Sequence, residues 1–260
     1  MNLPQELLEE ILSYLPPEDV QDQQSLANCS LVSKSWTNPS RRHLFKTVDI
    51  REKSLQPWRD TISPANHELL QHIQALLYIT DAKTWRTGRP PAYRIYVLQD
   101  YLPFLHRLQH LSLFSVQIPS DISPKLEIFS AFQYTLSHLS LVDCDVSISA
   151  LVTLINYFPS LDHLDLSSFR RNTDGMPTPS LSRPRMSRLH LSDLRTDALR
   201  FFNKLSRFGP AFDEVVVGGR LPVCLPALTR IAYTVGENAK RVELLQTSGI
   251  CTCACPENSW

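Results

Sequence analysis

The segment Leu108-Gln-His-Leu-Ser-Leu113 recurs along the chain and sets the expected architecture. Copies with the same spacing of apolar residues begin at residues 136, 161 and 186, so neighbouring copies start 25 to 28 residues apart. The segment 212–217 continues the series, and the segment 73–78 is a looser copy upstream. Apolar residues at every second position of a short strand point to one side. The pattern therefore predicts repeated strands that stack and share one apolar core.

The Leu-x-x-Leu-x-Leu spacing resembles the leucine-rich repeat. The resemblance implies an α/β fold over residues 47–250, an irregular leucine-rich-repeat solenoid with parallel strands on the concave face and helices outside. Helical returns are predicted at 148–157 and 197–208. Such repeats usually place Asn or Cys three positions after the last strand leucine, and only Cys144 does so here, so irregular repeats are expected. An unrelated parallel α/β sheet is the alternative.

The amino-terminal sequence predicts two short helices. Residues 3–15 carry apolar side chains at intervals of three and four, which places them on one helical stripe that ends at Pro16-Pro17. A second helix is predicted over 23–37, closed by Pro39. Two such helices cannot bury an independent core, so we expect them to need a partner surface.

The same residues resemble the F-box. The motif Leu3-Pro4-x-Glu6-Leu7 is followed by Cys29-Ser-Leu-Val-Ser-Lys-x-Trp36 at the expected separation. The resemblance implies a three-helix domain at residues 1–46 that binds a Skp-type adaptor and, through it, a cullin. The implied adaptor-binding positions are Leu3, Pro4, Leu7, Ile11, Leu15, Leu31, Val32 and Trp36. A helical pair that merely caps the repeat domain is the alternative. The strand-like segment 47–50 is expected to start the next domain.

Composition excludes several classes of protein. With 43% hydrophobic residues in 260, the chain can build a substantial core. Its 26 basic and 26 acidic residues balance, so no global field draws it to nucleic acid or to an anionic membrane. The apolar runs fall short of the roughly 20 residues that span a bilayer. The first residues lack a secretory pattern, and isolated cysteines suit a reducing compartment. We expect an intracellular protein of the cytoplasm, the nucleus or both.

The positions between the strand leucines are the candidate target-binding face. They are His110, Ser112, Phe114, His138, Ser140, His163, Asp165 and His190. His110, His138 and His163 share one register and suggest ligand contact, pH sensing or metal binding. A solvated polar position copied with the repeat is the favoured interpretation, since no carboxylate or cysteine ligand is expected beside the row. Small polar residues with an aromatic side chain suit protein recognition.

Enzyme signatures are not found in the sequence. Phosphate-loop, dinucleotide-binding, zinc-protease and nucleophile-elbow motifs are missing, so we expect a non-catalytic protein with no catalytic residue, cofactor or metal site. Cys251, Cys253 and Cys255 stand in the segment 251–260 and suit a soft metal or disulfide exchange. We expect instead a disordered, functionally silent tail, because zinc sites need four ligands with wider spacing.

These observations lead to one functional hypothesis and two rivals. The first is a substrate-recognition subunit of an SCF-type E3 ubiquitin ligase that binds the adaptor at its amino terminus and a target protein through its repeats. The second is a non-degradative interaction scaffold that uses the same adaptor contact. The third is a hydrolase or metal-dependent enzyme built on the histidine row or the cysteine tail. The target protein is not identified by the sequence.

Overall fold

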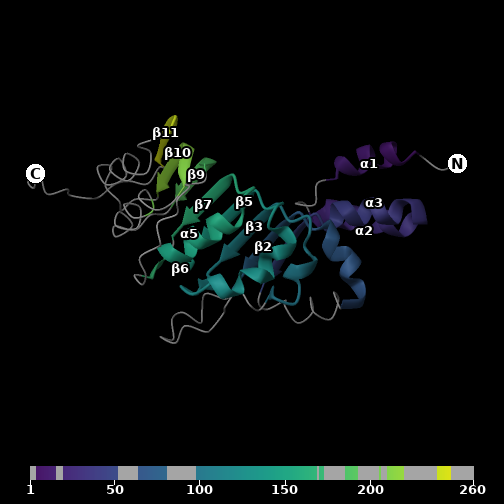
Figure 1. The fold of residues 1–260 in the computed structure, drawn as a ribbon. Helices are drawn as coiled ribbons and strands as arrows, with labels where there is room; N and C mark the ends of the chain where they lie inside the picture. Colours follow the sequence, from purple (N-terminus) through teal and green to yellow (C-terminus); the bar gives the residue numbers. More distant parts are fainter. Residues whose placement is uncertain are drawn as a thin grey trace, which may run out of the picture.

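The fold consists of three amino-terminal helices followed by parallel strands (Figure 1). The computed structural model describes residues 4–15, 20–51, 64–80, 98–168, 170–172, 185–192, 205, 210–219 and 239–246. The helices are α1 (Gln5–Ser13), α2 (Val20–Val32), α3 (Lys34–Leu44) and α5 (Ile148–Tyr157), with 3-10 segments η2 (Pro64–His72), η5 (Leu102–Phe104) and η6 (Ser123–Phe132). The strands are β1 (Thr47–Arg51), β2 (Ala75–Ile79), β3 (His110–Phe114), β4 (Gln117–Ile118), β5 (His138–Val142), β6 (Asp145–Ser147), β7 (His163–Ser167), β8 (Arg170–Asn172), β9 (Arg185–Ser192), β10 (Ala211–Gly219) and β11 (Arg241–Gln246).

Helix α1 packs on α3, which in turn packs on α2. Pro4 precedes the first turn of α1, and its carbonyl accepts a hydrogen bond from Leu8 N at 3.2 Å. Leu8 and Leu12, four positions apart on one stripe, are buried. The Arg42 guanidinium on α3 lies 3.4 Å from the Glu9 carboxylate and links the two helices. The helical stripe predicted over 3–15 is therefore present in α1.

The prediction of one helix over 23–37 is wrong in its boundaries, because this segment belongs to two helices, α2 and α3. The backbone extends at Ser33, with φ −162° and ψ 166°, so α2 ends before it and α3 begins after it. Trp36 N and Thr37 N both donate to the Ser33 carbonyl at 3.1 Å, which starts the new helix. Pro39 lies inside α3 and is buried instead of closing the helix. Burial of its ring offsets the intrahelical hydrogen bond that proline cannot donate.

Eight parallel strands form the main sheet in the order β1-β2-β3-β5-β7-β9-β10-β11. The spatial order follows the chain, so each strand lies beside its predecessor after an outward connection. The predicted strand 47–50 is present as β1, at the edge next to the helices, and β11 lies at the opposite edge (Figure 1). A single core therefore runs along the sheet from the helical end to the far end.

The apolar residues of the recurring segment lie side by side. Aligned across the sheet are Leu76, Leu111, Leu139, Leu164, Leu189 and Val215. All six are at most 3% exposed, because the period of two turns every alternate side chain to the same face. The prediction of stacked strands with a shared apolar core is confirmed.

Each of three central strands ends in the same tight turn. Ser115, Asp143 and Ser168 follow β3, β5 and β7 with φ of 57°, 52° and 48°. Their N–H groups donate to the carbonyl of the last residue in the next strand, at 2.8, 2.8 and 3.2 Å. These main-chain hydrogen bonds satisfy the turns in place of the asparagine side chains that leucine-rich repeats usually have and that the sequence mostly lacks. The turns lead into a second parallel sheet, β4-β6-β8.

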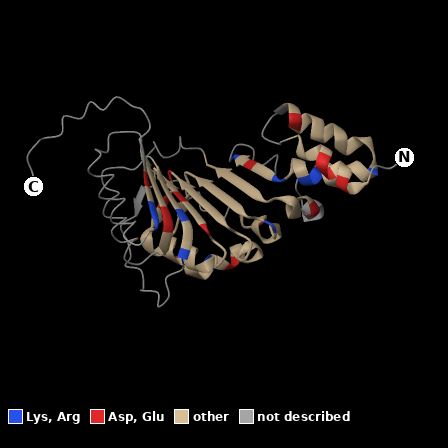
Figure 2. Ribbon diagram, turned by 90° about the horizontal axis from the view of Figure 1, so that it is seen from above, with Lys and Arg blue, Asp and Glu red and all other residues tan. Residues whose placement is uncertain are grey.

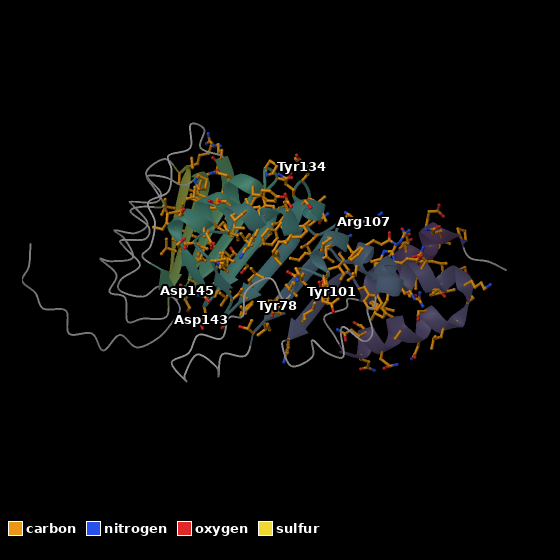
Figure 3. All side chains as sticks on the ribbon, turned by 60° about the horizontal axis from the view of Figure 1, so that its bottom comes forward. Tyr78, Tyr101, Arg107, Tyr134, Asp143 and Asp145 are labelled. Atoms are coloured by element: carbon orange, nitrogen blue, oxygen red, sulfur yellow. The ribbon has the colours of Figure 1, made fainter. Side chains whose placement is uncertain are left out.

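The connections cover the leucine side of the sheet. The predicted helix 148–157 coincides with α5, which the Ser147 hydroxyl caps by accepting a hydrogen bond from Ala150 N at 3.1 Å. Within the described residues, the returns that contain η2 and η6 form 3-10 segments where outer helices were expected. The predicted helix 197–208 lies outside the described residues apart from Leu205. Figure 3 shows Arg107 and Tyr134 at the edge where the strands begin, and Asp143 and Asp145 at the edge where they end.

Candidate functional site

Helix α1 presents an apolar stripe to solvent. Leu7 and Ile11 are 45% and 44% exposed, and Tyr14 is 76% exposed. Spacings of four and three place them on one side of the helix, beside the buried stripe of Leu8 and Leu12. A nine-residue helix with apolar side chains on two sides carries more apolar surface than its own module covers. The uncovered stripe is suited to contact with another protein.

A second exposed apolar pair ends α2. Leu31 is 84% exposed and Val32 is 68% exposed, whereas Leu26 on the same helix is fully buried. The chain reverses at the extended Ser33 directly afterwards, which leaves the pair outside the packed helices. Large aliphatic side chains this exposed are common at protein interfaces.

The remaining predicted adaptor-binding residues differ in their exposure. Pro4 is exposed at the start of α1, and Leu15 and Trp36 are half-buried. Leu3 lies outside the described residues. Among the described residues of the predicted set, five are exposed, and four of these are large aliphatic side chains, Leu7, Ile11, Leu31 and Val32.

The main sheet turns a polar face away from its leucine core. Ser112, Ser140 and Asp165 occupy one row of opposite positions, and His190 continues it. These side chains and Phe114 are half-buried, and His110 is exposed. The predicted target-binding residues thus share a single face. Polar and aromatic side chains held by neighbouring strands form a suitable surface for a protein segment.

Three histidines form a stack on this face. His110, His138 and His163 are directly opposite one another on β3, β5 and β7. Their ring centroids lie 5.2 Å and 5.8 Å apart, with interplanar angles of 24° and 4°. Burial lowers the pKa of His110, and charge on His138, His163 and Lys46 lowers it further. Protonation of His110 is therefore disfavoured at its place in the stack.

A carboxylate accompanies the histidine row, so the prediction that none stands beside it is wrong. Asp165 Oδ2 lies 2.8 Å from His138 Nε2, and its Oδ1 lies 3.7 Å from His190 Nδ1. Burial alone would raise the pKa of Asp165, but hydrogen bonding and charge from His138 together with charge on His190 and Arg188 outweigh it and lower the pKa. The contact is diagonal between strands, which comparison of like positions in the repeats does not reveal.

The described residues do not build a metal centre. Among them, no group of three or more His, Cys, Asp or Glu side chains is placed to hold a metal ion. Cys144 is buried, and its thiol lies 3.2 Å from the Leu113 carbonyl, between the repeats. Cys251, Cys253 and Cys255 lie outside the described residues.

Charged residues on β9, β10 and β11 were missed by sequence reasoning. Asp213 accepts from Arg185 Nε at 2.6 Å and from Lys240 Nζ at 3.2 Å. The hydrogen bond from Arg185 is the main reason that the pKa of Asp213 is lowered. Arg188 lies 3.3 Å from Glu214. Figure 2 shows these charges gathered at the sheet end farthest from α1–α3. The repeat register could have pointed to Arg188, because Arg188 occupies the position that His163 fills in the preceding copy.

Comparison with known proteins identifies the amino-terminal module. Residues 1–51 match the F-box-like family. No curated protein matches the chain. In the part of the chain that the structure describes, no helix has both the length and the apolar character needed to cross a membrane. F-box domains typically bind Skp-type adaptors, which indicates an adaptor role in SCF-type complexes. Residues 1–51 of this chain form an F-box-like domain joined to a largely parallel α/β domain.

Proposed function

We propose that the chain is a substrate-recognition subunit of an SCF-type E3 ubiquitin ligase. The observation that carries the proposal is a pair of exposed apolar sites on the F-box-like domain. One site is Leu7 with Ile11, and the other is Leu31 with Val32, whereas Leu26 of the same domain is buried. Covering these sites with a Skp-type adaptor removes apolar surface from water at both helices. The adaptor then links the chain to a cullin.

The sheet domain supplies the second half of the proposal. We assign it to the leucine-rich-repeat class, as an irregular solenoid, because six of its strands align their apolar residues in one row and its strand order follows the chain. The face with His110, His138 and Asp165 is opposite that row and carries the target protein. Its half-buried polar side chains offer donors and acceptors at fixed spacing along the sheet.

The mechanism we propose is proximity. Holding the target on the sheet and the adaptor on the helices raises the effective concentration of a target lysine near the ubiquitin-charged enzyme. The chain needs no reactive group for this task, so we propose a non-catalytic protein without a cofactor. We place it inside the cell, in the cytoplasm, the nucleus or both, with no nucleic acid or membrane partner.

A non-degradative scaffold is the alternative function. It uses the same adaptor contact and the same polar face, and it differs only in the fate of the bound protein. Reconstitution with adaptor, cullin and ubiquitin-conjugating enzyme distinguishes the two functions once a bound protein is identified. Transfer of ubiquitin to that protein supports the ligase, and stable binding without transfer supports the scaffold.

The proposal is tested by co-expression with a Skp-type adaptor and pull-down. The wild-type chain is expected to capture the adaptor, and Leu7→Asp with Ile11→Asp is expected to abolish capture because two charges enter an apolar contact. Leu31→Asp with Val32→Asp tests the second site in the same way. Tyr134→Asp is the matched control, since Tyr134 is 71% exposed but belongs to the sheet domain.

Circular dichroism of each variant establishes that loss of capture does not follow from unfolding. If the folded wild-type chain captures no adaptor, the ligase proposal is contradicted. Equal capture by the wild type and by both double variants removes these residues from the adaptor contact.

A further inference from the structure

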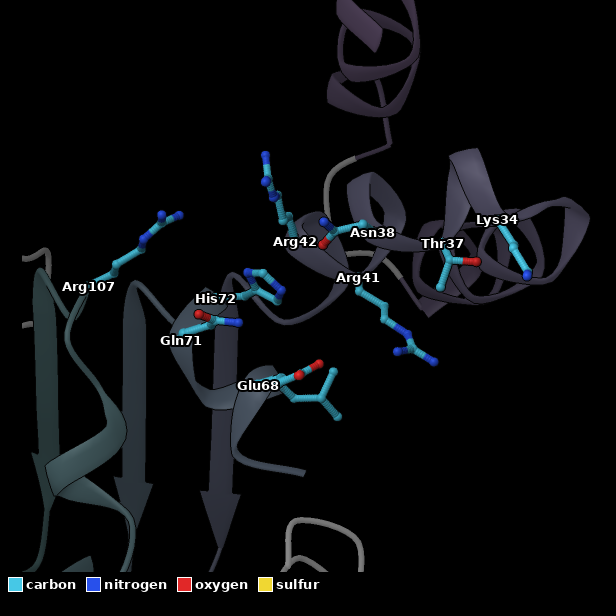
Figure 4. A pocket seen from close by; sticks show the side chains of 10 residues that line it. Lys34, Thr37, Asn38, Arg41, Arg42, Glu68, Gln71, His72 and Arg107 are labelled. Carbon is cyan, nitrogen blue, oxygen red and sulfur yellow. The ribbon is translucent and has the colours of Figure 1, made fainter. Parts of the chain in front are cut away.

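A basic pocket lies between the F-box-like domain and the sheet domain. Its volume is about 530 Å³, within the range of small-molecule sites. Figure 4 shows side chains from α3 on one side and from η2 and the segment before β3 on the other. The lining residues are Lys34, Thr37, Asn38, Arg41, Arg42, Glu68, Leu69, Gln71, His72 and Arg107. Nine of these ten residues have polar or charged side chains, and Leu69 is the exception, so the lining favours a polar ligand.

The pocket concentrates positive charge in a protein whose total charge is balanced. The lining contains four cationic side chains, Lys34, Arg41, Arg42 and Arg107, and a single carboxylate, Glu68. Arg42 also reaches Glu9, at 3.4 Å. Within the described residues, Lys34, Arg41 and Arg107 have no carboxylate at ion-pairing distance. Like charges brought together without counter-charges repel one another, and a bound anion relieves that repulsion.

The pKa of His72 is lowered by its surroundings in the pocket. Burial lowers the pKa of His72 most, and charge on Arg42, Arg107 and Arg41 lowers it further. Its Nδ1 atom is buried, and it has no hydrogen-bond partner among the described residues. The pocket therefore combines cations from two domains with an unsatisfied ring nitrogen.

We propose that this pocket binds a phosphate-bearing ligand. Phosphate groups offer several acceptor oxygens, and guanidinium groups bind them through paired, charge-assisted hydrogen bonds. Arg41 and Arg107 come from α3 and from the segment before β3, so a phosphate-bearing ligand in the pocket contacts both domains. The bound ligand holds the F-box-like helices against the first strands and fixes the separation between the apolar sites and the sheet face.

Titration calorimetry of the full-length chain with tripolyphosphate tests the proposal. Binding is expected at low ionic strength, and Arg41→Ala with Arg107→Ala is expected to weaken it at least about tenfold through the loss of two charge-assisted contacts. Arg51→Ala with Lys125→Ala removes the same charge outside the pocket and serves as the matched control. Tripolyphosphate is also expected to raise the melting temperature of the wild type but not of the pocket variant.

A second titration distinguishes the source of the phosphate. A short peptide with one phosphoserine among glycines and alanines replaces tripolyphosphate, with the unphosphorylated peptide as its control. Binding of tripolyphosphate that depends on the pocket arginines supports a free polyphosphate ligand. Pocket-dependent binding of the phosphopeptide alone supports a phosphorylated side chain as the ligand.

Two outcomes overturn the proposal. One is a folded wild-type chain that binds neither probe. The other is an equal loss of binding in the pocket variant and in the control variant, because the effect is then one of net charge. If Arg41→Ala with Arg107→Ala fails to fold, Arg107→Lys keeps the charge and removes the planar fork. Weaker binding by this variant supports the site, and unchanged binding contradicts it.

Discussion

His138 Nε2 and Asp165 Oδ2 lie 2.8 Å apart across β5 and β7, although the two residues are not opposite each other. The register places Ser140 opposite Asp165 and His163 opposite His138, so the contact runs diagonally. His138 consequently has a carboxylate partner, whereas the pKa of His110 is lowered by burial and by its charged neighbours. The histidines of one row thus differ in their electrostatic surroundings.

The diagonal pair predicts a measurable coupling energy. In a double-mutant cycle of His138→Ala and Asp165→Ala, we expect about 0.5–1.5 kcal/mol of favourable coupling in the free energy of unfolding at pH 6. This range allows for solvent screening, since the side chains are 26% and 30% exposed. Urea denaturation of the four proteins measures it. Additive effects of the two substitutions contradict the expectation.

The strands could be predicted from the sequence because each copy repeats the same alternation. Leu111, Leu139 and Leu164 are separated by more than 20 residues, yet their identical slots place them side by side. The break at Ser33 could not be predicted in this way. Cys29 and Trp36 continue a helical spacing through it, and the side chain of Ser33 makes no capping hydrogen bond. Tertiary packing of α3 decides that boundary.

The polar contacts could not be predicted from the sequence alone, because they depend on how the strands and helices are placed in three dimensions. Asp165 was assigned to the correct face from its place between two leucines, but its partner His138 depends on strand twist and side-chain direction. The basic pocket unites Lys34 with Arg107, and no periodic pattern relates residues so far apart. Local periodicity therefore predicts the elements and the buried face, whereas contacts between elements depend on their docking.

Acid is expected to destabilise the folded chain in a window set by histidine. The pKa values of His110, His43 and His72 are lowered below 6.5, in each case chiefly by burial. The unfolded chain then binds protons more readily than the folded chain, so stability is fully present above pH 6.5 and falls as the pH drops toward the folded pKa values.

Urea midpoints between pH 7.5 and 5 measure this loss. His110→Gln removes one of the three histidines and is therefore expected to make the loss of stability with acid smaller. Gln109→Ala, at the exposed neighbouring position, is expected to leave the pH dependence as in the wild type. A midpoint that rises with acid over this range is incompatible with the three lowered pKa values.

Neighbouring leucines of α1 are expected to separate folding from binding. Leu8 is 1% exposed, and Leu8→Ala is expected to destabilise the helical domain by about 2–5 kcal/mol. Leu7 is 45% exposed, and Leu7→Ala is expected to change stability by at most about 0.5 kcal/mol while weakening adaptor capture. Hydrogen exchange in α1 and pull-down provide the two measurements. Faster exchange in Leu7→Ala than in Leu8→Ala contradicts the assignment of the two stripes.

Cys144 is expected to resist alkylation for as long as the chain is folded. Burial raises the pKa of its thiol to about 12, so at pH 8 almost no reactive thiolate is present. Iodoacetamide treatment followed by peptide mass spectrometry should leave Cys144 unmodified in the folded chain and modified in urea. Cys29, half-buried on α2, provides the internal comparison and should react sooner. Because Cys144 lies between the repeats, modification of Cys144 at the rate of Cys29 would mean that the sheet opens there without global unfolding.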